Sequence, residues 1–198
     1  ADGAWQIWSC IRSTREWGNR RLFHRWEGQQ ITDRDWVPMG ISMRAQQVPH
    51  GEQSGGLQAP HVIRVNDVYY MFYGDWVRIC LAKSEDGKEF RRVVDLDGQP
   101  DLFSGPWTNS RDAMVLFWNG VYYCYYTGHL GFRKAGADFC RTSVDLRNWS
   151  DPVIVAMGGE AGSGTWSAEC PFVVYRDGYF YLFRTQRYGQ NNQTTVYA

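Results

Sequence analysis

Several features that mark common classes of protein are missing from the sequence. The 21 basic and 21 acidic residues cancel to a formal net charge of zero, and no block of like charges occurs, whereas nucleic-acid-binding proteins carry a basic stripe or patch. No apolar run approaches the roughly 18 residues of a membrane helix. No two cysteines have the C-x-x-C spacing, and the histidines show no ligand spacing for zinc. We therefore expect no nucleic-acid or membrane partner, no metal site and no cofactor.

The five cysteines also fit no disulfide framework, because their number is odd and four of them lie inside hydrophobic runs. We interpret them as buried thiols. They do not settle the compartment, although a secreted or periplasmic location is slightly favoured over a cytoplasmic one. No signal peptide opens the chain and Ala1 is not a natural start, so we expect that the beginning has been processed or cut away.

Hydrophobic and aromatic residues are plentiful. The 198 residues are 43% hydrophobic, which is enough for one domain with a sizeable core. Aromatic residues make up 16% of the chain. Flat, amphipathic rings suit the C–H faces and hydroxyl edges of carbohydrates, and they suit a β-rich core equally well. Composition alone leaves both interpretations open.

One hairpin pattern recurs along the chain. Each copy is an apolar strand, a two-residue turn and an aromatic strand, and Asn-Gly or Asp-Gly between such runs is a strong hairpin signal. Residues 2–11 supply the turn and second strand of a partial copy. The complete copies span 61–76, 112–128 and 170–186, with turns at Asn66-Asp67, Asn119-Gly120 and Asp177-Gly178.

Further strands follow the hairpins and complete units of four strands. We expect third strands in 21–28, 79–90, 138–149 and 194–198, and short fourth strands in 91–96 and 152–158. The turns recur at spacings of 64, 53 and 58 residues, which is typical of β-propeller blades. A β-sandwich is the alternative, but it would not explain the repeated unit.

The repeat predicts an all-β chain that holds an incomplete propeller domain over 1–198. We expect a first strand before Ala1, and about one and a half blades after Ala198, to be missing. Parts of four blades of antiparallel strands remain: blade 1 at about 1–45, blade 2 at about 58–100, blade 3 at about 110–157 and blade 4 at about 168–198.

Two carboxylates fall at equivalent places in adjacent blades. Aligning the hairpins on their turns gives Pro60, Ala113 and Pro171 one shared location, the start of the innermost strand near the propeller axis. Asp112 lies one residue before this location, and Glu169 lies two residues before it. We therefore expect both side chains to converge on one end of the central channel.

Other candidate site residues are expected at the same mouth. The second strand of each hairpin runs back to this end, and the loops 46–58, 104–110 and 158–167 arrive there. His61 could hydrogen-bond a sugar or be a satisfied core histidine, and each of Trp76, Trp107 and Trp166 could stack on a sugar or simply pack. The candidate substrate-binding residues are His61, Asp75, Trp76, Arg111, His129, Trp166, Arg184 and Gln186.

An Asp and a Glu across a pocket provide what glycoside hydrolysis needs. One carboxyl group protonates the leaving oxygen, while another carboxylate attacks the sugar or activates water. Like charges close together raise the pKa of one group, which keeps it protonated as the acid. The alternative is that Asp112 and Glu169 form ion pairs or cap loops, Asp112 with Arg111.

Three short motifs resemble those of a known group of enzymes, the five-bladed β-propeller glycoside hydrolases of families 43 and 32. "RDA" at 111–113 looks like the Arg-Asp-Pro motif of family 32, and "ECP" at 169–171 looks like its Glu-Cys-Pro motif. "QAPHV" at 58–62 is closer to the Trp-Ala-Pro-Asp segment of family 43. In this sequence Ala113 replaces the usual proline, and His61 replaces the Asp of the family 43 segment.

The resemblance implies roles for the two carboxylates. Glu169 would be the general acid, and Asp112 would stabilise the transition state and tune that acid. The family's third carboxylate, a nucleophile or base, would fall roughly five positions before Ala1 by the repeat alignment. We therefore expect a glycoside hydrolase acting on a plant, algal or microbial oligosaccharide or polysaccharide, with furanosidic or other non-reducing-end residues as candidates.

Two other classes of function are compatible with a propeller. A carbohydrate-binding propeller without catalysis would bind glycans but not turn them over, and a protein-interaction propeller would show apolar or charged rim surfaces. The sequence does not determine the sugar, the linkage, retaining or inverting chemistry, or the oligomeric state.

Overall fold

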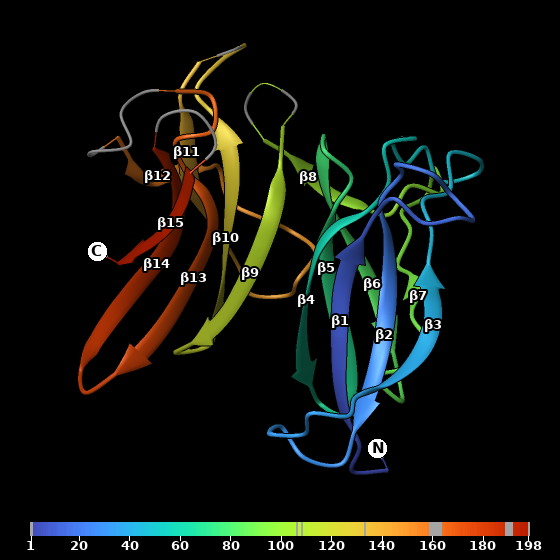
Figure 1. Cartoon of the computed structure of the whole chain (residues 1–198). Coiled ribbons are helices and arrows are strands. Elements are labelled where there is room, and N and C mark those ends of the chain that lie inside the picture. The colour runs from blue at the N-terminus through green and yellow to red at the C-terminus, as the bar shows by residue number, and fades with distance from the viewer. Residues whose placement is uncertain are drawn as a thin grey trace. The chain divides into compact units, whose positions relative to one another are not determined.

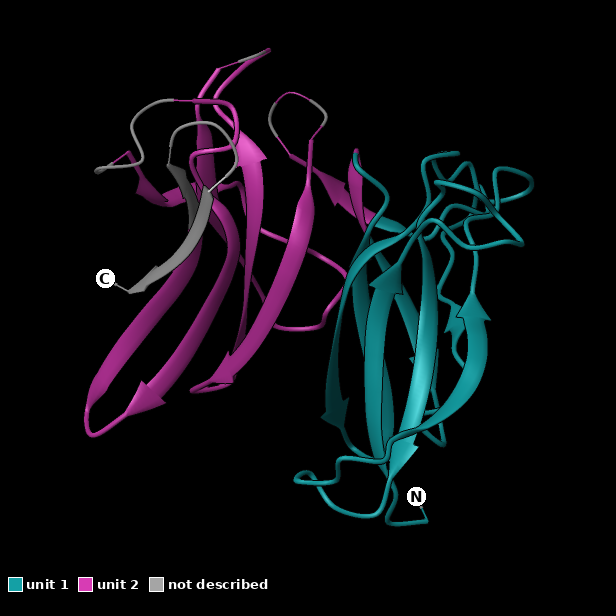
Figure 2. Ribbon diagram, in the orientation of Figure 1, with its two compact units in different colours: residues 1–76, 80–101 teal, residues 77–79, 102–198 magenta. Residues whose placement is uncertain are grey.

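The computed structural model describes residues 2–105, 107, 109–132, 134–158, 164–188 and 192–197, with the backbone alone for 186–188 and 192–197. Every element in this described part is a β-strand (Figure 1). The chain divides into two compact units, unit 1 at 1–76 and 80–101, and unit 2 at 77–79 and 102–198 (Figure 2). Within the described residues no helix has the length and apolar character of a membrane span.

The N-terminal half of the chain contains two antiparallel sheets. The first has the order β1-β2-β3, and the second has the order β4-β5-β6-β7, with β8 also paired to β6. The strand bounds are β1 Trp5–Ile11, β2 Leu22–Gly28, β3 Val37–Met43, β4 Gln58–Val65, β5 Val68–Gly74, β6 Arg78–Ser84, β7 Arg91–Arg92 and β8 Asp101–Ser104.

The C-terminal half contains two further antiparallel sheets, both in unit 2. Their orders are β12-β11-β10-β9 and β13-β14-β15, so chain neighbours pair with one another throughout. Their bounds are β9 Arg111–Trp118, β10 Val121–His129, β11 Gly136–Ser143, β12 Val153–Met157, β13 Glu169–Arg176, β14 Tyr179–Tyr188 and β15 Asn192–Tyr197.

The three predicted hairpins are confirmed as β4-β5, β9-β10 and β13-β14. In each turn both central residues have positive φ, which is the type I′ geometry that matches strand twist. The asparagine and aspartate at the first position tolerate this conformation better than most residues. The φ values are 46° and 65° at Asn66-Asp67, 49° and 82° at Asn119-Gly120, and 52° and 87° at Asp177-Gly178.

One predicted fourth strand is shorter than expected. The run 91–96 was predicted to be a strand, but β7 ends at Arg92. The carboxylate of Asp95 accepts hydrogen bonds from the N–H groups of Asp97 and Gln99. This local turn competes with the sheet ladder, as Asp side chains commonly do. The strands β3 and β8 were not individually predicted.

A buried glutamate organises the core of unit 1. Glu52 is fully buried and accepts hydrogen bonds from the hydroxyl of Tyr73 at 2.7 Å and from Arg92 at 2.8 and 2.7 Å. The backbone N–H of Gln46 donates to the same carboxylate at 2.7 Å. Burial is the main cause that raises the pKa of Tyr73. Because its charge is paired and its oxygens are bonded, Glu52 fixes a loop to the sheet.

The Ser-x-Asp motif stabilises the turns that follow β6 and β11. The hydroxyl of Ser84 donates to Asp86 Oδ1 at 2.7 Å, and the hydroxyl of Ser143 donates to Asp145 Oδ1 at 3.0 Å. Backbone N–H groups of the following residues also donate to both aspartates. These bonds lower the pKa of Asp86 to about 2. The motif therefore locks a turn.

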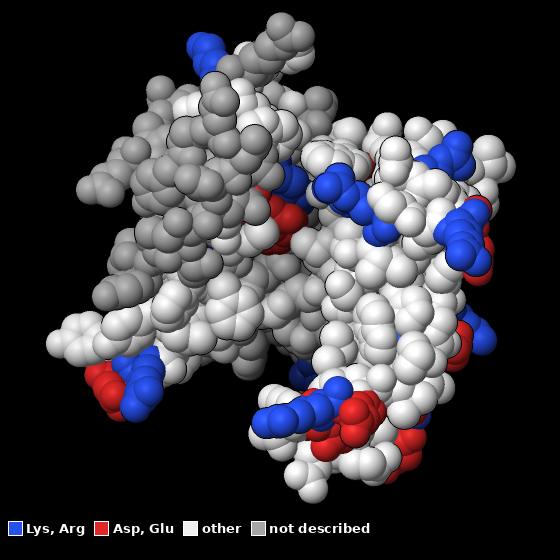
Figure 3. All heavy atoms as spheres, in the orientation of Figure 1, with Lys and Arg blue, Asp and Glu red and all other residues white. Residues whose placement is uncertain are grey.

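Charges on the surface are mixed. On the face shown in Figure 3, basic and acidic side chains adjoin in several places. The ion pair of Arg44 with Glu16 at 2.7 Å, and that of Lys88 with Asp2 at 2.6 Å, are examples from unit 1. Such exposed pairs contribute little to stability.

Candidate functional site

A β-bulge marks the start of the inner strand in each complete hairpin. In β9, Asp112 and Ala113 together oppose one residue of β10, and Asp112 has φ of 58°. The same interruption occurs in β4 at Ala59, with φ of 43°, and in β13 at Cys170, with φ of 55°. Bulges of this kind re-aim side chains at the ends of strands. The sequence alignment treats the starts of β4, β9 and β13 as equivalent, and all three have the same bulge with a residue of positive φ.

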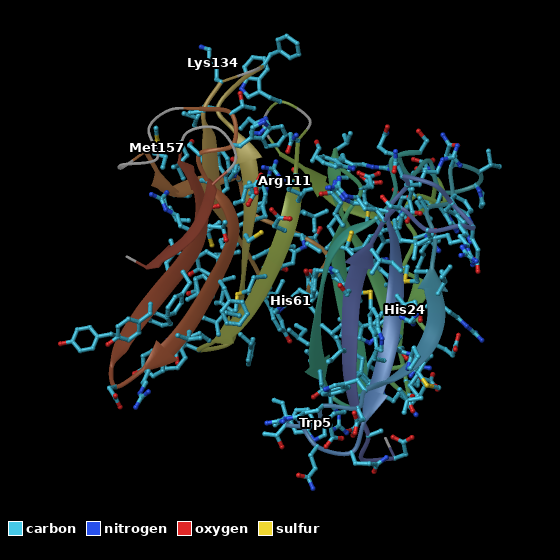
Figure 4. All side chains as sticks on the ribbon, viewed as in Figure 1. Trp5, His24, His61, Arg111, Lys134 and Met157 are labelled. Carbon is cyan, nitrogen blue, oxygen red and sulfur yellow. The ribbon has the colours of Figure 1, made fainter. Side chains whose placement is uncertain are left out.

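Arg111 lies between the two predicted catalytic carboxylates, all in unit 2. Its side chain is only 3% exposed, and it lies at the N-terminal end of β9 (Figure 4). Its Nη2 donates to Glu169 Oε1 at 3.3 Å, and its Nε is 3.6 Å from Asp112 Oδ2. One guanidinium therefore partly balances two carboxylates from neighbouring hairpins. The ion pair of Asp112 with Arg111, which the sequence left as an alternative, is present in the structure.

An aromatic residue covers this arginine. The guanidinium carbon of Arg111 lies 5.1 Å from the centroid of the Trp166 ring, within the range of a cation–π contact. Trp166 also meets the His129 ring edge-on at a centroid distance of 5.6 Å. The residue is 40% exposed, so part of its surface remains accessible. An accessible ring beside polar groups is suited to a sugar face.

A glycine allows the loop that carries Trp166 to approach the sheet. A Cβ on Gly136, at the start of β11, would lie 2.9 Å from the carbonyl oxygen of Thr165 and 3.1 Å from the nitrogen of Ala168. The N–H of Gly136 donates to the carbonyl of Gly164 at 3.0 Å. Any side chain at this position would push the loop away from β11.

His129 is a buried, neutral side chain next to the arginine. Burial is the main cause that lowers its pKa, and the positive charge of Arg111 adds to the effect. Its Nε2 is buried and has no hydrogen-bond partner among the described residues. The neutral ring can accept or donate one further hydrogen bond, which suits a hydroxyl group.

Two residues that the sequence analysis did not single out lie behind the carboxylates. Thr127 on β10 and Asp138 on β11 pair directly across the sheet, and both are fully buried. The hydroxyl of Thr127 donates to Asp138 Oδ1 at 3.3 Å and accepts from the N–H of Cys170 at 3.0 Å. That same N–H is 3.4 Å from Asp112 Oδ2. The sequence held no signal for this pair, because only the register of β10 against β11 brings the two residues together.

Burial makes Asp138 an unusual acid. Desolvation is the largest cause that raises its pKa to about 7, and the charge of Asp112 adds to it. Arg184, the hydrogen bond from Thr127 and Arg111 act in the opposite direction. Its Oδ2 has no hydrogen-bond partner among the described residues.

The other predicted residues have varied positions. Arg184, on β14, is buried and donates from Nη2 to the carbonyl of Gly158 at 3.0 Å. Gln186 is paired within β14 and β15, but its side chain lies outside the described part. Three others belong to unit 1: His61 is partly buried in β4, Asp75 is fully buried, and Trp76 has the Arg21 guanidinium 4.4 Å from its ring centroid.

No group of three or more potential metal ligands occurs among the described residues. The groups that meet around Arg111 in unit 2 are instead the carboxylates of Asp112 and Glu169, the neutral His129 and the partly open Trp166, with the buried Asp138 nearby. Such a set can exchange a proton, stabilise positive charge and hydrogen-bond hydroxyl groups.

Comparison with known proteins identifies the fold. No protein-family model matches the sequence, and no curated protein matches it. A thermostable family-43 glycoside hydrolase superposes with a TM-score of 0.72 at 20% identity, over 100% of this chain and 65% of that one. A sucrose-6-phosphate hydrolase from Lactobacillus gasseri gives 0.71 at 14%, over 93% and 38%. An exo-1,5-alpha-L-arabinanase from a bovine ruminal metagenomic library gives 0.73 at 12%, over 100% and 70%.

These similarities confirm the predicted fold. The chain is all-β and has the fold of part of a five-bladed β-propeller of the kind found in glycoside hydrolase families 43 and 32. It spans 65% of the family-43 hydrolase and 38% of the sucrose-6-phosphate hydrolase, and so only part of their length.

Proposed function

We propose that this chain carries acid/base carboxylates of a glycoside hydrolase that acts on an oligosaccharide or polysaccharide. The observation that carries the proposal is the placement of Arg111 between Asp112 and Glu169, with Trp166 over the arginine. Carboxylates from two neighbouring strands, beside a partly open aromatic ring, match the requirements of glycosidic bond cleavage. Plant, algal or microbial glycans are the substrate class, with furanosidic or other non-reducing-end residues as candidates.

In the proposed mechanism Glu169 protonates the glycosidic oxygen as the bond to the sugar breaks. Asp112 faces the positive charge that develops on the sugar ring and stabilises it electrostatically. Arg111 holds both carboxylates at fixed positions, so that little reorganisation is needed during the reaction. The third carboxylate, the nucleophile or base, is proposed to precede Ala1 in the full protein, at the position that the repeat alignment indicates.

Candidate substrate contacts surround this pair. Trp166 is proposed to stack on a sugar ring, and His129 to hydrogen-bond a hydroxyl group. Arg184 and Gln186 would hold further hydroxyls from β14. His61, Asp75 and Trp76, which belong to unit 1, remain candidate sugar contacts on the sequence alone.

A carbohydrate-binding protein without catalysis is the second candidate function. The specific observation in its favour is that Arg111 already contacts both carboxylates. Charge-balanced carboxylates are good acceptors for sugar hydroxyls even where no bond is cleaved. Binding of glycans by the wild-type protein without turnover would support this alternative.

Replacement of Glu169 by glutamine in the full-length protein tests the proposal. Loss of a general acid lowers rates by about 10²–10⁴, so we expect that decrease in kcat/KM on an unactivated glycan. An aryl glycoside with a good leaving group needs little protonation and should lose much less. Glu85→Gln, at an exposed position of unit 1, is the matched control. Normal glycan turnover by Glu169→Gln would refute the proposal.

A further inference from the structure

A chain of hydrogen bonds connects the interior of unit 2 to the candidate catalytic residues. It begins at Asp138 and passes through Thr127, both fully buried, to the backbone N–H of Cys170. Cys170 directly follows Glu169 and has φ of 55°. The series of hydrogen bonds therefore ends at the peptide group between Glu169 and Cys170, where the backbone of β13 bends.

The direction of each bond in this chain is fixed when Asp138 is ionised. A backbone N–H can only donate, so the Thr127 oxygen accepts from Cys170 at 3.0 Å. The single hydroxyl proton of Thr127 is then available for Asp138 Oδ1, which accepts it at 3.3 Å. Valine at position 127 would have nearly the same shape but could do neither. Thr127 thus relays a change at Asp138 to the Cys170 peptide.

We propose that Asp138, acting through Thr127, is a positioning residue that holds the Glu169–Cys170 peptide beside Asp112; the inference rests on the proposed function. The Cys170 N–H is shared between Thr127 Oγ1 and Asp112 Oδ2, the latter at 3.4 Å. If the hydrogen bond from the Cys170 N–H to Thr127 becomes stronger, the bond from the same N–H to Asp112 becomes weaker, and the reverse also holds. Such a change thereby alters the placement of both carboxylates.

The charges around Asp138 make the relay sensitive to pH. Arg111 and Asp112 act on it from β9 and Arg184 from β14, and burial raises its pKa to about 7. Ionisation converts the bond from Thr127 into a charge-assisted one, which is stronger than its neutral form. It also places a negative charge behind Asp112. A residue that only filled space would have neither effect.

The test uses Asp138→Asn and Thr127→Val in the full-length protein. The first readout is the Cys170 amide resonance in NMR spectra between pH 5 and pH 9. We expect it to titrate with a midpoint near that of Asp138 in the wild type and to stay flat in both variants. The second readout is kinetic: Thr127→Val should lower kcat about fivefold, the effect of one ordinary hydrogen bond, with KM little changed. Thr142→Val, on β11 of the same sheet, is the control.

The outcomes separate this inference from the proposed function. A Cys170 resonance that is flat in the wild type, or a folded Thr127→Val variant with unchanged kcat, would overturn the positioning role. Absence of glycan hydrolysis by the wild type would overturn the proposed function instead. The Cys170 titration would then decide by itself whether Asp138 and Thr127 control this peptide.

Discussion

Replacement of Asp138 by asparagine should change how the stability of the protein depends on pH. In the unfolded chain the Asp138 carboxyl has its ordinary pKa of 3.8, whereas burial raises it to about 7 in the folded protein. As pH rises through this interval, the unfolded state releases the proton and the folded state keeps it. The free energy of unfolding therefore falls with rising pH and levels off above about 7. Asparagine does not titrate, so this decrease should vanish in the variant.

The expected magnitude follows from the width of the interval. From 3.8 to about 7 is about three pH units, and each unit corresponds to about 1.4 kcal/mol, which gives about 4 kcal/mol. The variant should thus gain about 4 kcal/mol over the wild type between pH 4 and pH 8. At pH 4, where Asp138 is protonated in the folded wild type, the difference in free energy of unfolding between variant and wild type measures the effect of replacing a neutral acid by an amide.

Urea unfolding followed by tryptophan fluorescence, at each pH from 4 to 8, measures this difference. Asp151→Asn is a suitable control, because Asp151 is exposed and lies just before β12 in the same unit. We expect the control to follow the wild type within about 0.5 kcal/mol at every pH. A stability difference between Asp138→Asn and the wild type that is constant over this range would refute the assignment of Asp138 as a buried neutral acid.

Two further substitutions test the packing described above. Glu52→Gln should lower the free energy of unfolding by about 3–5 kcal/mol, because it leaves the charge of Arg92 without its buried partner; denaturant unfolding measures the loss. Gly136→Ala should cost about 1–3 kcal/mol, because its Cβ would lie 2.9 Å from the Thr165 carbonyl oxygen. The same variant should shift the amide resonances of the 164–168 loop.

Matched controls exist for both. Glu16→Gln removes the exposed ion pair with Arg44 and should change stability by less than about 1 kcal/mol. Gly164→Ala adds a methyl group where no atom lies within 4 Å, so the loop should keep its position. Equal losses in a test variant and its control would show that the named contacts do not account for the effect.

The fold could be predicted because its signals are local. Turn residues that favour positive φ, such as Asn119-Gly120, fix the hairpins, and the hairpins recur with a regular spacing. Residues in equivalent positions of a repeat occupy equivalent places, which agrees with the contact that Asp112 and Glu169 both make with Arg111. The bulges at 112–113 and 170–171 were not predicted, since nothing in a single strand distinguishes a bulge from continued alternation.

The supporting residues could not be predicted for a different reason. Asp138 and Thr127 meet through the pairing of β10 with β11, and the connection between these strands is not a two-residue turn whose sequence fixes the register. Gly136 is one of 21 glycines, and only the approach of the 164–168 loop distinguishes it. Long-range contacts of this kind depend on register and loop paths rather than on local sequence.

The bulge at Asp112 has a consequence for how such a site can change during evolution. Side chains alternate between the two faces of a strand, and an extra residue reverses that alternation for everything that precedes it. Deleting a single residue at the bulge would therefore move Arg111 to the opposite face while leaving the rest of β9 in place. Insertions and deletions at these three points could exchange the functional groups of a blade in one step, without redesign of its core.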